Sequence, residues 1–188
     1  MSITLREMTA DDIGQNFAIT QRLKWPHRRE DWLQAVALGD GVVAEENGAF
    51  LGSALGWRWG ERAATIGLVI VNEQFRGRGV GKQLMLALLE KFPGYDVRLH
   101  ATEMGKGLYA KLGFNVTGHI QQHQTPAVAV IPAVTIPVGL TLRNAVPDDA
   151  SALTGLDRQA HGMWRARVID LLIADCQTVI LEDAQNRI

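Results

Sequence analysis

The feature that most constrains the fold is an apolar run followed directly by a basic, glycine-rich turn. Residues 64–71 read ATIGLVIV, which is long and apolar enough for a strand buried on both faces. Residues 76–82 read RGRGVGK, and leucines at helical spacing predict a helix over 79–91. Glycines let the backbone approach a ligand closely, and a helix N-terminus offers unpaired N–H groups. This order predicts a phosphate site; the alternative is a turn whose cations are merely solvated.

Composition narrows the class of protein that carries this turn. The chain has 188 residues, of which 47% are apolar and 21% charged, as in ordinary globular domains. Its net charge of −1 argues against a nucleic-acid or membrane-surface partner. Cys176 is the only cysteine, so an intrachain disulfide is impossible and a reducing compartment is favoured. No apolar run approaches the roughly 18 residues of a membrane span, so we expect a cytoplasmic protein; no residue is assigned to a metal.

The spacing of apolar residues predicts alternating strands and helices, and hence an α/β fold. Asn47-Gly48 is the strongest hairpin signal in the chain, and it joins two strands within residues 40–60. The other predicted elements are strands at 3–8, 64–71, 96–102 and 114–124, and helices at 11–23, from Pro26 to Leu38, at 79–91 and at 105–113.

After a proline-rich segment, the sequence repeats the pattern of its first residues. Three prolines punctuate residues 126–139, which read as an extended linker or an edge strand. Placing residues 3–46 on 140–183 without a gap pairs ITLR with LTLR, TADD with VPDD and VVAEE with VILED. The simplest interpretation is a second copy of the β-α-α-β opening. No counterpart of the glycine-rich turn follows it.

Half of such a fold would leave strand edges and an apolar face uncovered. The copy is therefore expected to pack on the first domain, to pair with another chain as in a homodimer, or to belong to a longer protein that has been truncated. We favour truncation. Trp164 and residues 168–176, VIDLLIADC, would then lie at an interface with a missing C-terminal half-domain.

Two motifs connect the chain to a known family. The glycines at 77, 79 and 81 fit neither the Walker pattern nor the dinucleotide pattern, but Arg76-x-x-Gly79-x-Gly81 resembles the pyrophosphate signature of the GNAT acetyltransferase superfamily. GLYAKLGF at 107–114 resembles the later helix and strand of that family, with its embedded tyrosine. The resemblance covers residues 3–124 and extends to a type in which one complete domain precedes a second, diverged one.

The resemblance implies a GNAT fold, with a mixed, mostly antiparallel sheet flanked by helices and a partial second copy of the N-terminal half. The implied domains are a complete acetyltransferase domain at 1–125, a linker at 126–138 and a partial GNAT-like domain at 139–188. It also implies that acetyl-CoA is the cofactor. The implied contacts are Leu68, Val69, Ile70 and Val71 along the pantetheine arm, Arg76, Gly77, Arg78, Gly79, Val80, Gly81 and Lys82 around the pyrophosphate, and Thr102, Gly107 and Tyr109 beyond them.

Acetyl transfer needs a neutral amine, a donor for the developing oxyanion and a proton for the departing thiolate. The resemblance assigns Tyr109 as the acid and an N–H of residues 69–71 as the oxyanion donor. The family often has a glutamate on its fourth strand, but residues 64–71 contain no carboxylate or histidine. The base is therefore open, and the candidates are Glu103, His100, His27 and Glu61. Thr102 also departs from the asparagine that the family often has at its position.

In this superfamily the segment between the first two helices usually borders the acceptor. Trp25, His27 and Arg28 lie in that segment, and Trp57 lies on the predicted third strand. They would suit a small amine with a carboxylate or an apolar group, although tryptophans more often fill cores. The hypotheses are an N-acetyltransferase acting on a small-molecule amine, a CoA-binding sensor without efficient catalysis, and an acetyltransferase of protein or peptide termini.

Overall fold

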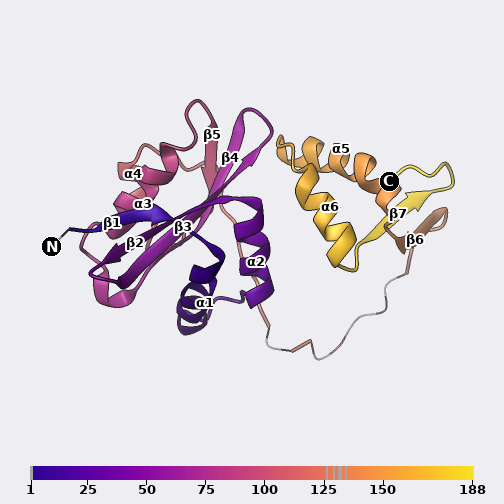
Figure 1. Ribbon diagram of the computed structural model, residues 1–188. Helices are drawn as coiled ribbons and strands as arrows, with labels where there is room; N and C mark the ends of the chain where they lie inside the picture. The colour runs from indigo at the N-terminus through magenta and orange to yellow at the C-terminus, as the bar shows by residue number, and fades with distance from the viewer. Residues whose placement is uncertain (1, 126, 129, 131–132, 134) are drawn as a thin grey trace. The chain divides into compact units, whose positions relative to one another are not determined.

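The computed structural model describes residues 2–125, 127–128, 130, 133 and 135–188. The chain divides into two compact units, the first ending at Val116 and the second beginning at Thr117 (Figure 1). Among the described residues, no helix combines the length and the apolar character that crossing a membrane requires.

The first unit is built on a five-stranded mixed sheet, whose strands follow one another in chain order. Neighbouring strands are antiparallel except the last pair, in which β4 and β5 run parallel. Asn47 and Gly48 both have positive φ, 52° and 77°, as the predicted tight hairpin requires. The strands are β1 (Thr4–Glu7), β2 (Asp40–Glu46), β3 (Ala49–Trp59), β4 (Ala63–Val71) and β5 (Asp96–Leu99).

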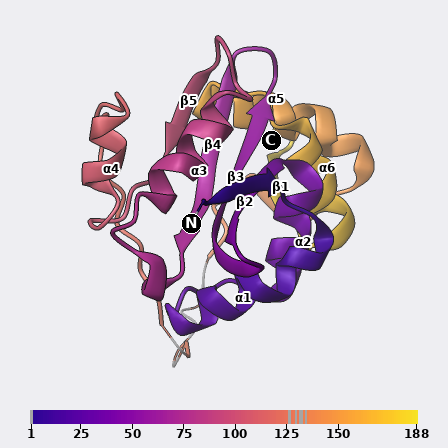
Figure 2. The ribbon, with the colours of Figure 1, turned by 60° about the vertical axis from the view of Figure 1, so that its left-hand side comes forward.

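Helices cover both faces of this sheet (Figures 1 and 2). On one face, α1 (Ile13–Arg22) and α2 (Arg29–Leu38) bury a cluster that includes Trp32 and Ile70. On the other face, α3 (Val80–Leu89) buries Leu84 and its neighbours against the sheet, and α4 (Lys106–Lys111) adds partly buried residues there. The parallel β4–α3–β5 crossover is the unit that places a helix N-terminus at the end of a central strand. The α/β fold predicted from the sequence is confirmed for this unit.

The predicted strand at 114–124 is wrong. The N–H of Phe114 closes the turn after α4 by donating to the carbonyl of Tyr109, 3.1 Å away, and residues 115–125 are exposed and form no strand. The segment is rich in glutamine and histidine and has few apolar residues, so forming a strand would bury little apolar surface. In the predicted linker, 126–138, positions 126, 129, 131, 132 and 134 lie outside the described residues.

The second unit has the element order of the start of the first. Its strands β6 (Leu140–Asn144) and β7 (Val179–Asp183) form an antiparallel pair, and between them lie α5 (Ala150–His161) and α6 (Ala166–Asp175). The pairing of Leu142 with Leu181 corresponds to that of Leu5 with Ala44, at the spacing that aligns residues 140–183 with 3–46. The two units therefore share both order and register over this stretch.

An arginine between two carboxylates recurs at equivalent positions in both units. In the first, Arg6 donates to Asp12 at 2.6 Å and to Glu45 at 3.0 Å. In the second, Arg143 donates to Asp149 at 2.7 Å and to Glu182 at 2.8 Å. Each arginine thereby joins the first strand to the second strand and to the turn that opens the first helix.

The cluster lowers the pKa of both aspartates. The Arg143 side chain, followed by the backbone N–H of Val146, holds the pKa of Asp149 at about 2, against an ordinary value of 3.8. The guanidinium of Arg6 likewise lowers the pKa of Asp12. A carboxyl whose folded pKa is depressed stabilises the fold above its ordinary pKa, and this stabilisation is lost as pH falls through the folded value.

We expect Asp149→Asn to lower the urea midpoint of the second unit near pH 7 and to reduce the dependence of that midpoint on pH between about pH 4 and pH 2, where Asp157 and Asp183 still contribute. The measurement is a urea titration of the β6 and β7 amide NMR signals at several pH values. Asp148→Asn is the matched control, because Asp148 is exposed and lies outside the cluster. Equal losses in both variants would contradict the assignment.

Candidate functional site

A β-bulge interrupts the middle of β4. Ser53 pairs with Ile70 and Leu55 pairs with Gly67, so that Leu68 and Val69 together face a single residue of β3. Leu68 has a φ of 50°, a left-handed conformation that is uncommon for a non-glycine residue. Such bulges re-aim side chains next to functional sites. Side chains an even number of residues apart normally lie on the same face of a strand. The bulge changes this, because Ile66 belongs to the α3-side cluster whereas Ile70 belongs to the α1-side cluster.

Beyond the bulge, β4 has a free edge. The parallel pairing with β5 covers only Ala63–Ile66 of β4. In the part of the chain that the structure describes, no strand pairs with residues 67–71 on that side. Such an edge can hydrogen-bond an extended ligand as if it were another strand.

Two glycines in the turn after β4 adopt a conformation that other residues avoid. Gly77 and Gly79 each have a φ of 79°, and a Cβ built on either would meet nothing within 4 Å. Gly79 is the N-cap of α3. Gly81 matters for packing instead, since a Cβ there would lie 3.3 Å from the Leu108 side chain. The turn is thus shaped by glycine, and its outer side is open.

The amides of this turn are available to a ligand. The backbone N–H groups of 77–82 donate to no group of the described chain, and the first intrahelical donor nearby is Gln83, which binds the carbonyl of Gly79 at 3.1 Å. These N–H groups lie at the positive end of the α3 dipole. The chain's own atoms therefore do not occupy the position that an anion would take.

The cations of the turn are partly neutralised by nearby carboxylates. Arg78 donates to both oxygens of Glu46, at 2.7 and 2.9 Å, and Arg76 lies 3.3 Å from Glu73. Lys82 is exposed and has no ion pair within the described residues. The repulsion among the cations is thus offset in part before any ligand binds.

Tyr109 lies on α4 and is partly buried. Its ring packs over Gly105, where a Cβ would come within 2.8 Å of it, and edge-on to Phe114 with ring centroids 6.1 Å apart. It packs against the same buried cluster on the α3 side as Val69 and Val71 of β4. Burial raises the pKa of Tyr109 above its ordinary value, so the phenol is protonated at neutral pH.

The other predicted residues near β5 and α4 are exposed. Thr102 accepts from the N–H of Gly105 at 3.3 Å and so helps to begin α4, on which Gly107 also lies. Glu103 is paired with Lys106 at 2.5 Å, and its side chain is 87% exposed. His100 follows β5 instead of lying within it, because β5 ends at Leu99 and not at 102 as predicted.

The segment between α1 and α2 forms an aromatic cluster. The His27 ring lies 5.7 Å from Trp25 and 6.5 Å from the fully buried Trp32, measured between ring centroids. The buried Nδ1 of His27 has no hydrogen-bond partner in the described chain, and burial lowers the pKa of the ring. Arg28 is exposed, and its backbone N–H and guanidinium bind Asp31 at the start of α2.

Trp57 connects α2 to the bulged strand. Its indole N–H donates to the carbonyl of Ala35 at 2.9 Å, and its ring lies over Gly67, where a Cβ would come within 3.2 Å of it.

The site thus contains the bulge, the open β4 edge, the glycine turn and Tyr109 in one unit. The bulge and the contact of Arg78 with Glu46 were missed by sequence reasoning, because both depend on pairings between distant parts of the chain.

Comparison with known proteins shows which family this unit is similar to. Residues 38–116 match the family model of the acetyltransferase (GNAT) domain. An uncharacterized N-acetyltransferase of Bacillus subtilis, YitH, is 27% identical over 129 residues, which are 68% of this chain and 45% of that protein. A mycothiol acetyltransferase of Frankia alni is 33% identical over 130 residues, 62% of this chain and 37% of that protein. The chain thus spans less than half the length of the curated relatives that it matches.

Solved structures share the fold. A proposed acetyltransferase of Pyrococcus horikoshii has a TM-score of 0.68 at 24% identity, over 92% of this chain and 62% of its own. A predicted acetyltransferase of Clostridium acetobutylicum, determined with acetyl-CoA, has a TM-score of 0.54 at 18% identity, over 65% of this chain and 96% of its own. The first unit of the chain therefore has the fold of these structures, and residues 38–116 within it are similar to the acetyltransferase (GNAT) domain.

Proposed function

We propose that the first unit transfers the acetyl group of acetyl-CoA to the primary amine of a small molecule. The observation that carries the proposal is the row of N–H groups at 77–82 that donate to no group of the described residues and follow shortly after the open edge of β4. Acetyl-CoA supplies a thioester, and the residues of this chain must hold it, stabilise negative charge and move two protons.

The described residues fit such a coenzyme. The N–H groups from Gly77 to Lys82 would hold the pyrophosphate, because they are free and the left-handed glycines leave their outer side open. The open edge from Leu68 to Val71 would bind the pantetheine arm through its backbone. Thr102, between β5 and α4, and Gly107, on α4, would border the arm on its other side.

Tyr109 would act as the acid. A phenol that burial keeps protonated can donate its proton to the departing thiolate. An N–H of Val69, Ile70 or Val71, beside the bulge, would stabilise the oxyanion, and one such donor is typically worth about 3 kcal/mol of transition-state stabilisation.

Four residues are candidates for the base that takes the proton of the amine. Glu103 is engaged by Lys106 and turned to solvent, and His100 and Glu61 are exposed. His27 fits best, because burial lowers its pKa and so keeps the ring in the neutral form that a base requires. Trp25, Arg28 and Trp57 would border the acceptor beside it, although Arg28 is already paired with Asp31.

A panel of amines tests the proposal. Purified protein is incubated with acetyl-CoA and primary amines of small molecules, and the release of free thiol is measured. Release above the rate of hydrolysis for at least one amine is the expected result. Tight CoA binding without turnover would instead indicate a sensor, which the lack of a carboxylate on β4 favours. Turnover only with peptides would indicate an acetyltransferase of protein termini.

For the second unit, we propose a diverged, partial GNAT-like domain over 139–188, joined to a complete domain at 1–125 by the segment 126–138. The shared register and the repeated arginine cluster support this reading. A homodimer, or a C-terminal half-domain that completes this unit, stays a prediction, as does the cytoplasmic location.

A further inference from the structure

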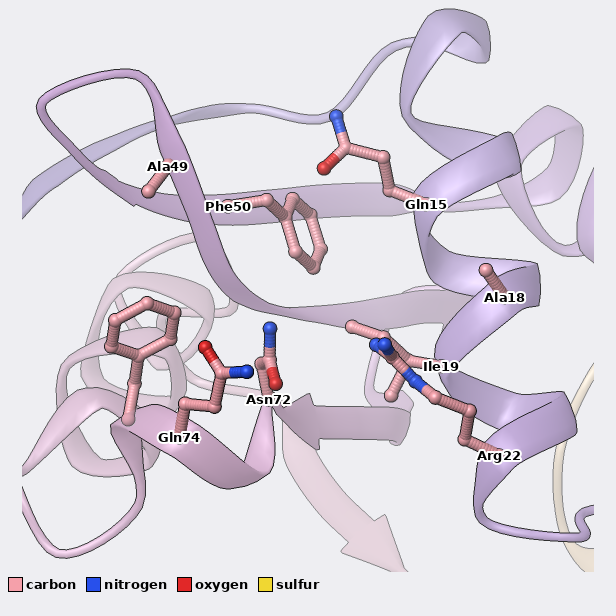
Figure 3. Close-up of a pocket in the computed structure, with 9 residues that line it drawn as sticks. Gln15, Ala18, Ile19, Arg22, Ala49, Phe50, Asn72 and Gln74 are labelled. Atoms are coloured by element: carbon pink, nitrogen blue, oxygen red, sulfur yellow. The ribbon is translucent and has the colours of Figure 1, made fainter.

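A pocket lies between α1 and the segment that follows β4, on the α1 side of the sheet (Figure 3). Its volume is about 370 Å³, which is enough for a small molecule. Ile19 of α1, Phe50 of β3 and Phe75 contribute apolar surface. None of these residues belongs to the coenzyme site proposed above.

Four polar side chains line the same pocket, and none of them is a carboxylate. Arg22 and Gln15 come from α1, and Asn72 and Gln74 come from the turn after β4. Figure 3 shows Arg22, Asn72 and Gln74 reaching into one space beside the ring of Phe50. In the described chain, the side chains of these four residues have no hydrogen-bond or ion-pair partner.

The pocket is separate from the edge that would bind the coenzyme. Ile70 lies on the same face of β4 as Leu68 and is only 2% exposed. Residues 68–71, which form the open edge, do not line the pocket. The pocket does adjoin the glycine turn, because the ring of Phe75 lies 5.7 Å from the Arg78 guanidinium.

We propose that this pocket binds a small carboxylate with an apolar body. A guanidinium matches the two oxygens of a carboxylate with two parallel N–H donors, and the amides supply further donors. One cation balances one negative charge, which favours a carboxylate over a doubly charged phosphate. The phenylalanine rings and Ile19 would contact the apolar part.

The test uses 4-phenylbutyrate and its neutral amide as matched probes, measured by isothermal titration calorimetry without acetyl-CoA. Omitting the coenzyme keeps this test independent of acetyl transfer. We expect the carboxylate to bind and Arg22→Gln to weaken it at least about tenfold, as is typical when a hydrogen bond to a charged group is lost. Arg29→Gln is the control, since Arg29 is also exposed but lies outside the pocket; it should leave the affinity unchanged.

Ala18→Phe provides a second variant, because it fills the pocket without changing charge, and it should also weaken binding. The amide fingerprint in NMR shows whether each variant is folded. Equal affinity for the acid and the amide, unchanged binding in Arg22→Gln, tighter binding of phenyl phosphate, or no binding of any probe would each overturn the proposal.

Discussion

Replacing Tyr109 with phenylalanine is expected to lower the kcat of acetyl transfer about a hundredfold or more, the usual contribution of a positioned acid. The Kd for CoA should change little. The substitution removes only the hydroxyl, so the contacts of the ring with Gly105 and Phe114 remain and α4 keeps its place. Steady-state kinetics gives kcat, and calorimetry gives the Kd.

The dependence of kcat on pH tests the same role. Burial raises the pKa of Tyr109, so the acid form persists above neutral pH and the loss of its proton should lower activity only at alkaline pH. In Tyr109→Phe this alkaline loss should be absent from the residual rate. Tyr95→Phe is the matched control, because Tyr95 is also partly buried but packs on Phe92 before β5. Equal losses of kcat and CoA affinity in Tyr109→Phe would show that the hydroxyl is structural.

The elements with strong local signals were predictable. The hairpin at Asn47-Gly48 needs two residues with positive φ, which that dipeptide supplies, and the structure has both. Gly79 likewise begins α3, as the glycine-rich turn before a helix predicted. In each case a few neighbouring residues decide the backbone conformation, so the local sequence is enough to predict the element.

The bulge in β4 could not be predicted in this way. Leu68 is an ordinary strand residue by composition, and its φ of 50° follows from the pairing of β4 with β3. The early end of β5 has a similar origin, because β5 pairs with β4 only as far as Ile66. Both features are set by contacts between strands, which a single stretch of sequence does not record.

The same limit applies to the charges around the turn. The ion pair of Arg78 with Glu46, at the end of β2, joins distant parts of the chain and offsets one of the cations before any ligand binds. The free N–H groups, and not the guanidinium charges, are therefore the stronger sign of a phosphate site. Substitutions that change the backbone of the turn should matter more than those that remove one arginine.

Gly79→Val is accordingly expected to raise the Kd for CoA at least about tenfold, because a branched side chain would stand where the proposed pyrophosphate meets the N–H groups. The left-handed φ of 79° adds a loss of stability of about 1–3 kcal/mol, the usual cost of that conformation for a non-glycine residue. Calorimetry with CoA and thermal unfolding measure the two effects. Gly14→Val is the control, since Gly14 also has open space for a Cβ but no positive φ.

Gly79→Asn separates the effect of backbone strain on stability from the effect of a side chain that obstructs the proposed pyrophosphate site. Asparagine tolerates the left-handed conformation better than valine, so this variant should keep most of the stability. Its side chain would still project into the open side of the turn, where a Cβ meets no atom of the chain. CoA binding should therefore stay weak even though the fold is intact. If Gly79→Asn bound CoA as tightly as the wild type, the amides of 77–82 would not be the groups that hold the pyrophosphate, and the proposed acetyl transfer would lose its main support.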